Sequence, residues 1–477
     1  MKQDGVKEPH IQEGQASFME AKGRMDTVIR NGTAVLKDEV RSVDIGIKDG
    51  RIAQLGTTGL PQGAREIDAT GLIVMPGMID AHVHLNEPGL GDWEGFETGS
   101  AALAAGGCTT YLDMPLNGVP PTVTVAAFEQ KLAAARGRSH VDYALWGGLV
   151  PGKLDHLIPL HEAGVIGYKA FMSEPGGPGE DAFARVDDYT LLEGMKIIAS
   201  VGKVLALHAE SEPIVSKLGE SAKREGRTSA ADFVASRPII AELEAIHRAL
   251  FYAERTGCAL HFVHISSEEG VRMISEAKRR GVDVTVETCP HYLTLTDGML
   301  ARKGAAAKCA PPLRNAEEQQ KLWGAVASGQ VDMISSDHSP CPEEMKDKEH
   351  FADAWGGIAG AQSSLELIVG EGHVKRGLPL TAISRMLSYE PAKRFGLLDR
   401  KGEIRIGADA DLALVDLNAA YELKKEQLYH RHKHSPYIGE TMWCAVRSTL
   451  SRGRVVYDGK AGLTGGMTGE WQRYRRV

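Results

Sequence analysis

The sequence lacks the features that mark a secreted, membrane-spanning or disulfide-stabilised chain. Its six cysteines are scattered over 477 residues with no C-x-x-C pair, which indicates reduced thiols and not a disulfide framework. No apolar run approaches the roughly 18–20 residues that span a bilayer. The polar start MKQDGVKEPHIQEGQ also lacks the apolar stretch of a secretory signal. We therefore expect a cytoplasmic protein with no membrane partner.

Positive charge is not in excess either. Lys and Arg number 55 against 63 Asp and Glu, which gives a formal net charge of −8. Such a chain has no global field that would attract DNA or RNA, so no nucleic-acid partner is expected. Hydrophobic residues make up 43% and charged residues 25% of the chain, which is typical of a globular protein. The length allows one large core and a smaller one.

The two ends of the chain share a pattern of short strands. Residues 1–24 form a polar leader, which we expect to be flexible. Alternating strand patterns with tight-turn signals follow in 25–75 and return in 391–477; VIRNGTAV and TLSRGRVV are similar examples. This similarity predicts one small β-sandwich domain that is built from both chain ends. Two unrelated hairpin tails are the alternative.

The middle of the chain, 76–390, has a different sequence pattern. Eight short apolar runs alternate with amphipathic helical patterns. The runs are LIVMPGMID, GCTTYLDM, VDYALWGGLV, GVIGYKAF, KVLALH, ALHFVH, VDVTVE and VDMISSD. The spacing of Ser266 and Glu269 predicts a capping box at one helix start. Strands of this kind indicate a parallel sheet buried on both faces, and eight units fit a (β/α)8 TIM-like barrel. The alternative is an open doubly wound sheet, although no G-x-G-x-x-G follows the first run.

Unusual polar side chains end or follow five of these runs. They are His82 and His84 after the first run, Lys169 near the end of the fourth, His208 and His264 at the ends of the fifth and sixth, and Asp337 at the end of the eighth. In a barrel, the carboxyl ends of the strands converge on one face, where active sites are built. Four imidazoles and a carboxylate suit a divalent metal such as zinc. The set therefore predicts a metal site.

Lys169 stands inside an apolar run, where a charged ammonium group is costly. A lowered pKa would leave a neutral amine. Such an amine can react with carbon dioxide to give a carbamate, an anion that can bridge two cations. The alternatives are a snorkelling strand end, a buried ion pair, or a Schiff-base lysine in an enzyme without metal.

The predicted site favours metal-assisted hydrolysis. Two metals that share a water would lower the pKa of that water toward about 7, and the bridging hydroxide would attack a carbonyl carbon. Asp337 is placed to act as the general base and acid, taking the proton of the water and passing it to a leaving nitrogen. No serine in a G-x-S-x-G setting competes for the role of nucleophile. The expected substrate bond is an amide or related C–N bond.

The motifs that carry this chemistry resemble those of the amidohydrolase superfamily. PGMIDAHVHLNEPG, IGYKAF, LALHAE, FVHISS and SSDHSP are similar to its cyclic-amidase branch of dihydroorotases, hydantoinases or dihydropyrimidinases, and allantoinases. The resemblance runs from about residue 26 to 460. It implies a homotetramer with two divalent metal ions, zinc first and cobalt, manganese or iron as alternatives. The implied ligands are His82, His84, N6-carboxylated Lys169, His208, His264 and Asp337.

Within the branch, several positions separate the subfamilies. Dihydroorotases carry an arginine where this chain has Asn86, and hydantoinases have a tyrosine near Ser173 and Glu174. The stretches DWEGFETGS, ASRP, KCAPPLR and AWGGIAG look like those of allantoinases, which implies that the hydantoin ring of allantoin is opened to give allantoate. A hydantoinase or dihydropyrimidinase is the alternative, followed by a non-catalytic dihydropyrimidinase-like scaffold.

Three further residues are expected to contact the substrate: Asn117, Ala310 and Ser339. Relatives often read CSPP where this chain has CAPP, so Ala310 lacks a hydroxyl that would help to hold the ring. The backbone groups of residue 310 remain as ring contacts.

Other segments are open to two interpretations. His291 either supports the metal site from behind or simply packs. The group of His430, His432 and His434 is interpreted as a solvated surface or interface patch. SEPGGPGEDAFARVDD and PEEMKDKEH are either lids over the site or surface loops.

Overall fold

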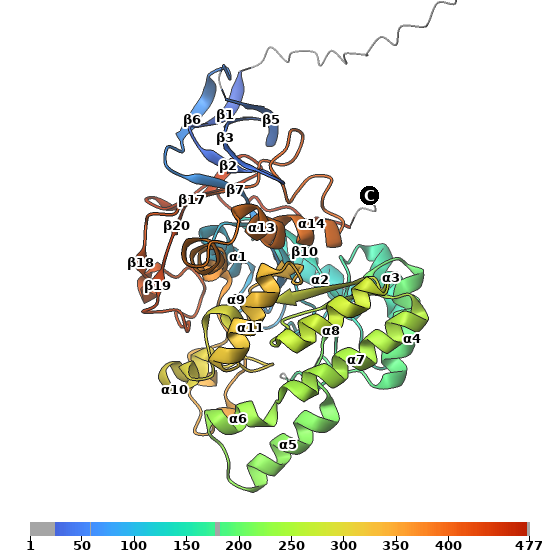
Figure 1. Ribbon diagram of the computed structural model, residues 1–477. Helices are drawn as coiled ribbons and strands as arrows, with labels where there is room; N and C mark the ends of the chain where they lie inside the picture. The colour runs from blue at the N-terminus through green and yellow to red at the C-terminus, as the bar shows by residue number, and fades with distance from the viewer. Residues whose placement is uncertain (1–23, 58, 177–181, 475–477) are drawn as a thin grey trace, which may run out of the picture.

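The computed structural model describes residues 24–57, 59–176 and 182–474. The predicted leader, 1–24, lies outside the described residues except for its last position. Figure 1 shows a helix-covered barrel with a β-rich domain at one end, in which blue strands of the N-terminal part lie beside red strands of the C-terminal part. No helix in the described part of the chain combines the length and apolar character needed to span a bilayer. All six cysteines are buried free thiols.

The predicted (β/α)8 barrel is confirmed. Its eight parallel strands in the described part of the chain are β8 (Met78–Val83), β9 (Cys108–Asp113), β10 (Asp142–Leu145), β12 (Tyr168–Phe171), β13 (Val204–His208), β14 (Ala259–Phe262), β15 (Val284–Thr288) and β16 (Met333–Ile334). The backbone N–H of Ile166 donates to the carbonyl of Leu145 at 2.9 Å and connects β12 to β10, next to the short β11 (Gly147–Gly148). The N–H of His84 donates to the carbonyl of His338 at 2.8 Å and closes the barrel between β8 and β16.

The first predicted apolar run is divided between two domains. Its first half forms β7 (Ile73–Pro76), which pairs with β17 (Leu412–Asp416) of the small domain. Its second half starts the barrel as β8. Gly77 lies at the division, where an added Cβ would approach the hydroxyl oxygen of Thr109 to 2.2 Å. The close approach to Thr109 therefore requires glycine between the two strands.

Helices cover the outside of the barrel. The longer ones are α1 (Phe96–Ala105), α2 (Val125–Ala135), α3 (Leu157–Ala163), α4 (Asp188–Ser200), α5 (Glu212–Arg224), α6 (Ala230–Ser236), α7 (Ile239–Thr256), α8 (Glu268–Arg279) and α11 (Ala316–Ala327). Shorter ones are α9 (Pro290–Thr294), α10 (Met299–Lys303), α12 (Ser364–Ile368), α13 (Leu380–Ser384) and α14 (Glu390–Arg394). Helices α5 and α6 extend from the barrel at the end away from the small domain (Figure 1).

The capping box predicted at Ser266 and Glu269 is wrong by one residue. Helix α8 is capped by Ser267, whose side chain accepts the N–H of Gly270. The hydroxyl of Ser266 instead donates to the buried carboxylate of Glu242 at 2.9 Å. Ser266 is therefore not the N-cap, because its hydroxyl is bound to Glu242, a residue distant in the sequence that the local pattern cannot reveal.

Both chain ends build the predicted β-sandwich. One sheet has the order β5-β4-β1-β6 and the other β22-β21-β20-β17-β7-β2-β3. Their remaining strands are β1 (Met25–Arg30), β2 (Thr33–Val35), β3 (Val40–Ser42), β4 (Asp44–Lys48), β5 (Arg51–Gly56), β6 (Gly63–Asp68), β20 (Ala445–Ser451), β21 (Arg454–Asp458) and β22 (Gly462–Leu463), with a separate pair β18 (Tyr421–Glu422) and β19 (Thr441–Met442). Ile29, Ile45, Val74, Leu412 and Leu450 are buried in the core of this domain.

A buried ion-pair cluster joins the small domain to the barrel. The ammonium of Lys401 donates to Asp142 at 2.8 Å, to Asp411 at 2.7 Å and to Asp409 at 3.2 Å. Asp142 belongs to barrel strand β10, whereas the other two aspartates precede β17. Burial by itself would lower the pKa of Lys401, but the three carboxylates raise it above its ordinary value. Lys401 therefore stays charged and donates to all three carboxylates at the domain junction.

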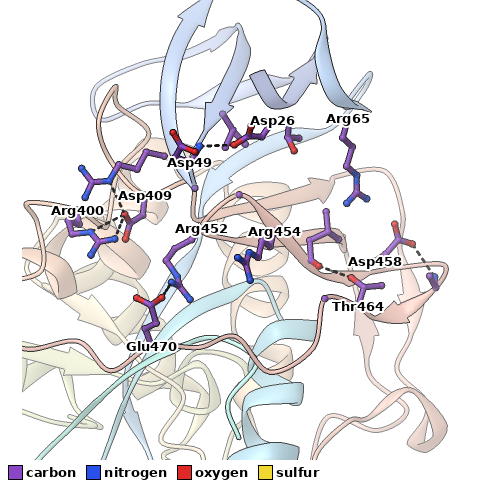
Figure 2. A pocket seen from close by; sticks show the side chains of 18 residues that line it. Asp26, Asp49, Arg65, Arg400, Asp409, Arg452, Arg454, Asp458, Thr464 and Glu470 are labelled. Carbon is purple, nitrogen blue, oxygen red and sulfur yellow. Dashed lines mark hydrogen bonds and ion pairs between the residues drawn. The ribbon is translucent and has the colours of Figure 1, made fainter. Parts of the chain in front are cut away.

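A cleft lined by charged side chains adjoins this cluster (Figure 2). Arg400 pairs with Asp409 at 2.8 Å, and Arg452 pairs with Glu470. Among the described residues, none of the six predicted metal ligands lines this cleft. One of its lining residues, Arg452, also lies 3.3 Å from Asp142 of barrel strand β10 and so connects the two domains.

Replacing Lys401 is expected to destabilise the protein strongly. Lys401→Met removes the buried cation that three carboxylates share and leaves Asp411 without its ion pair, which should lower the free energy of unfolding by about 3–5 kcal/mol. Urea or thermal unfolding measures the change. The control is Lys393→Met: this exposed lysine lies 3.8 Å from Glu390, and its loss should cost less than about 1 kcal/mol. Equal effects of the two substitutions would contradict a stabilising role of the cluster.

Candidate metal centre and active site

The six predicted ligand residues gather at the carboxyl ends of the barrel strands. His82 lies on β8 and His84 directly after it, Lys169 on β12, His208 at the end of β13, His264 just after β14, and Asp337 after β16. All six are buried. Five of them line one pocket, and Lys169 lies beneath it at 0% exposure. The barrel thus brings together residues that are up to 255 positions apart, from His82 to Asp337.

His82, His84 and Asp337 form the first half of the site. The Nε2 atoms of the two histidines lie 3.3 Å and 3.4 Å from the same carboxylate oxygen of Asp337. One ligand atom from each residue falls within a group no wider than 4.8 Å. Two imidazole nitrogens and a carboxylate oxygen at this spacing are a suitable donor set for a divalent ion such as zinc.

His208 and His264 form the second half. The Nδ1 of His208 and the Nε2 of His264 lie 3.0 Å apart. The ring of His264 is 5.4 Å from that of His82, centroid to centroid, which places the two halves side by side. Burial first, and then the neighbouring cations, lower the pKa of His264 well below its ordinary value. The imidazole is therefore neutral, as a metal ligand must be.

Lys169 lies close to residues of both halves, because its charge affects the pKa of His82, His208 and His264. Its amine is fully buried and has no hydrogen-bond partner within the described residues. Burial lowers its pKa to about 8, against the opposing effect of Asp337 and Glu287. An orphaned amine with this pKa, beside four histidines and an aspartate, fits a binuclear centre better than it fits a structural ion pair.

Several site residues have left-handed backbone conformations. The φ angles are 41° at His264 and 46° at Asp337, and they are 66° at Asn86 and 64° at Asn117. Such angles are uncommon for residues other than glycine and cluster at functional sites. Asn86 does not line the pocket; its amide donates to the carbonyl of Pro340 at 3.3 Å and supports the loop after β16.

Sequence reasoning missed Glu287, which orients His82. One carboxylate oxygen contacts Nδ1 of His82 at 3.0 Å, and the other contacts Nε2 of His261 at 3.2 Å. Burial would raise the pKa of Glu287, but His261 and His82 lower it below its ordinary value. The charged carboxylate turns Nε2 of His82 toward Asp337. The only signal in the sequence is an acidic residue within the apolar run VDVTVE.

Glu287→Gln is expected to weaken metal binding without emptying the site at saturating metal. Loss of the orienting carboxylate should lower metal affinity about tenfold to a hundredfold. Competition with a chromophoric chelator measures it. A matched control is Glu276→Gln, because Glu276 is on the solvent-facing side of α8 and pairs only with Arg272 at 3.3 Å among the described residues. Unchanged metal affinity in Glu287→Gln would contradict the orienting role.

Glu210 was also missed. Its carboxylate contacts Nε2 of His208 at 2.8 Å, so Nδ1 of that histidine faces His264. The same oxygen of Glu210 accepts a hydrogen bond from Arg237, which lines the pocket. Glu210 therefore connects a ligand residue to a cation on the pocket wall.

The residues predicted to contact substrate line the same pocket as the histidines. They are Asn117, Ala310 and Ser339. His291 does not line it; the ring is buried against Tyr292, and neither ring nitrogen has a partner in the described part of the chain. Burial lowers the pKa of His291 to about 4, so its ring is neutral.

The loop that contains PEEMKDKEH is attached to neighbouring segments through Lys346. The ammonium of Lys346 donates to the carbonyls of Ala305, Trp355 and Gly357 at 3.0, 2.9 and 2.6 Å. Trp355 and Gly356 form part of the pocket wall. Residues 342–350 themselves do not line the pocket and are mostly exposed, so PEEMKDKEH is a surface segment that Lys346 attaches to the pocket wall. From the other loop, Glu174 and Pro175 reach the pocket, whereas 177–181 lie outside the described residues.

The interpretation of His430, His432 and His434 as a solvated surface or interface patch is wrong for His430, whereas His432 and His434 are half-buried. His430 is 1% exposed. His432 contacts the carbonyl of Asp92 and His434 that of Cys341, both at 2.7 Å. These histidines attach the C-terminal segment to the loops that follow β8 and β16. The spacing of these histidines in the sequence could not reveal which backbone carbonyls they contact.

Comparison with known proteins identifies the class. The chain belongs to the amidohydrolase family, whose model matches residues 73–456. The model of the urease alpha-subunit N-terminal domain matches residues 4–78. Membership implies a binuclear divalent-metal site, and the candidate ligands for it are present.

The similar proteins within this family include allantoinases and a hydantoinase. An allantoinase of Solibacter usitatus is 50% identical over 433 residues, 91% of this chain and 94% of the relative. An allantoinase of Rubrobacter xylanophilus is 49% identical, over 92% of this chain and 96% of the relative. Among solved structures, the L-hydantoinase (dihydropyrimidinase) from Arthrobacter aurescens is 36% identical with a TM-score of 0.91, covering 94% of this chain and 100% of that one.

Proposed function

We propose that this enzyme is an allantoinase, which hydrolyses the cyclic amide bond of allantoin to give allantoate. The observation that carries the proposal is the convergence of four histidines and an aspartate in one pocket, with the buried Lys169 on a neighbouring barrel strand. The chain that holds them is about half identical to allantoinases along nearly its whole length. A hydantoinase or dihydropyrimidinase activity is the second candidate, favoured by the similarity to the L-hydantoinase structure.

We infer that two divalent ions, zinc first, are held by the six residues. His82, His84 and Asp337 would hold one ion and His208 and His264 the other, with carboxylated Lys169 between them. The carbamate forms when the neutral amine attacks carbon dioxide and releases a proton, so no further reactant is needed. When bound, the ions supply Lewis-acid activation of the amide carbonyl and of the attacking water.

Asp337 moves the proton. Burial would raise its pKa, but His82 and His84 hold the pKa at about 2. The carboxylate is therefore ionised at neutral pH and can accept a proton from the attacking water. It then returns this proton to the ring nitrogen when the C–N bond breaks.

The remaining pocket residues bind the ring. The side chains of Asn117 and Ser339 and the backbone of residue 310 are the polar groups placed to hold it. Leu116, Phe171 and Trp355 enclose it with apolar surface and exclude water.

A substrate panel tests the proposal. Metal-replete enzyme is assayed with allantoin, hydantoin, dihydrouracil and dihydroorotate at equal concentrations. We expect the highest kcat/KM for allantoin. A higher value for any other ring would reject the allantoinase assignment, and no turnover of any ring would favour the non-catalytic scaffold.

We further propose that the enzyme is a cytoplasmic homotetramer. The six buried free cysteines support a reducing compartment. Light scattering on the metal-loaded protein tests the oligomer, with a mass four times that of one chain as the expected result.

A further inference from the structure

Arg237 brings a positive charge to the wall of the active-site pocket. It follows directly after α6, in the α5–α6 extension that leaves the barrel after β13. The pocket also has apolar wall residues, Leu116, Phe171, Pro175 and Trp355, and one acidic wall residue besides Asp337, Glu174. The proposed ring chemistry uses histidines, Lys169 and Asp337, so it leaves Arg237 without an assigned role. Arg237 is also the arginine of the stretch ASRP.

Two contacts hold Arg237 in one position. Its Nη1 donates to the carboxylate of Glu210, the same oxygen that contacts His208. Its backbone carbonyl accepts a hydrogen bond from Nη1 of Arg314 at 2.7 Å, and Nε of Arg314 donates to Ser266 at 3.0 Å. Both the backbone and the guanidinium are thus anchored, so the side chain is preorganised.

The guanidinium nevertheless keeps free donors. An arginine carries five N–H groups, and the contact with Glu210 is the only hydrogen bond that the guanidinium of Arg237 makes to the described residues. The side chain is 21% exposed, and the residue lines the cavity. The guanidinium carbon lies 5.8 Å from the ring centroid of Phe233. Because the residue borders the cavity, the N–H groups that Glu210 does not use are available on the pocket wall, one carboxylate away from His208.

We propose that Arg237 is the specificity-determining residue for the exocyclic ureido group of the substrate. Allantoin differs from hydantoin by a ureido substituent on the ring carbon, and the free N–H groups of Arg237 donate to its carbonyl oxygen. The inference rests on the proposed function and defines the substrate class as hydantoins with a urea-type side chain. A site built to hydrogen-bond a substrate group discriminates against the analogue that lacks the group.

A purely structural role for Arg237 makes a different prediction. If Arg237 acted only by holding Glu210 and His208, its loss would slow the opening of every ring by the same factor. The ratio of kcat/KM for allantoin to kcat/KM for hydantoin separates the two roles, because hydantoin has no ureido group. Where hydantoin turnover is too slow to measure, its inhibition constant takes the place of kcat/KM.

The test compares wild type, Arg237→Gln, Arg237→Lys and Glu210→Gln, all metal-replete and with metal content measured. Arg237→Gln should lower the ratio about tenfold to a hundredfold, the range expected for one charged hydrogen bond. Glu210→Gln should slow both substrates because it acts through His208, and should lower the ratio less than Arg237→Gln does, because the amide oxygen can still accept a hydrogen bond from Arg237. If Arg237→Gln does not fold, Arg237→Lys gives the comparison, with a smaller fall in the ratio because lysine lacks the planar fork.

An unchanged ratio in Arg237→Gln or, where only that variant folds, in Arg237→Lys would overturn the inference. This result is distinct from failure of the proposed function, which would already be visible as absent or inferior allantoin turnover by the wild-type enzyme.

Discussion

Lys169→Ala is expected to slow allantoin hydrolysis by at least about a thousandfold, because the ions contribute several kcal/mol of transition-state stabilisation. The variant should also bind at least one metal ion fewer per chain than the wild type. The reason is that the amine of Lys169 is fully buried without a hydrogen-bond partner in the described part of the chain. It is also near enough to His82, His208 and His264 to lower the pKa of all three. No neighbouring side chain replaces a bridging anion at this point. Elemental analysis and steady-state kinetics measure the two effects.

A second buried lysine provides the control for this prediction. Lys203 is 4% exposed, and burial lowers its pKa to about 8, as for Lys169. It lies at the opposite end of a barrel strand, before β13, where it contacts the ring of Tyr474 at 3.8 Å. Lys203→Met should keep full metal content and turn over allantoin within about twofold of wild type, since surface and packing changes far from a site act weakly. Wild-type metal content and turnover in Lys169→Ala would contradict the bridging role.

Asp337→Asn is expected to lower kcat for allantoin about a hundredfold to ten-thousandfold, the usual contribution of a general acid–base group. The amide has nearly the same shape but cannot accept the proton. It also offers a weaker ligand to the ion held with His82 and His84, whose Nε2 atoms lie within 3.4 Å of the carboxylate.

Asp332→Asn is the matched control for Asp337→Asn. Asp332 is also buried, but it precedes β16 at the opposite end of the barrel, where it pairs with Lys278 at 2.5 Å. Its loss should lower stability and leave kcat of the folded enzyme within about threefold, because it contacts no site residue. If Asp337→Asn retained more than a tenth of wild-type kcat, Asp337 would not be the proton carrier.

The fold and the gathering of the site could be predicted because both follow from simple geometric rules. Each apolar run was long enough to be a buried strand, and parallel strands in a barrel end on one face. His208 and Asp337 could therefore be placed at the same site before any distance between them was known, although they are 129 positions apart in the sequence. The same rule placed His82 and His264, because each stands where a predicted strand ends.

The supporting residues could not be predicted because their roles depend on distances. Glu287 and Glu210 are ordinary acids in the sequence, and only the structure reveals that each contacts a ligand histidine within 3.0 Å. Arg237 reaches the pocket from an extension outside the regular barrel pattern. Similarly, the sequence predicts His430 to lie at the surface, and only the structure reveals that it is buried. Tertiary contacts of this kind leave no periodic signal.

Anomalous X-ray diffraction from crystals of the metal-loaded enzyme tests the central claim most directly. With data collected at the zinc absorption edge, two peaks are predicted: one beside His82, His84 and Asp337, and one beside His208 and His264. Electron density should extend the side chain of Lys169 by a carboxylate group that reaches both peaks. A single peak or none at these strand ends in crystals of active enzyme, or an unmodified Lys169 between two peaks, would contradict the account.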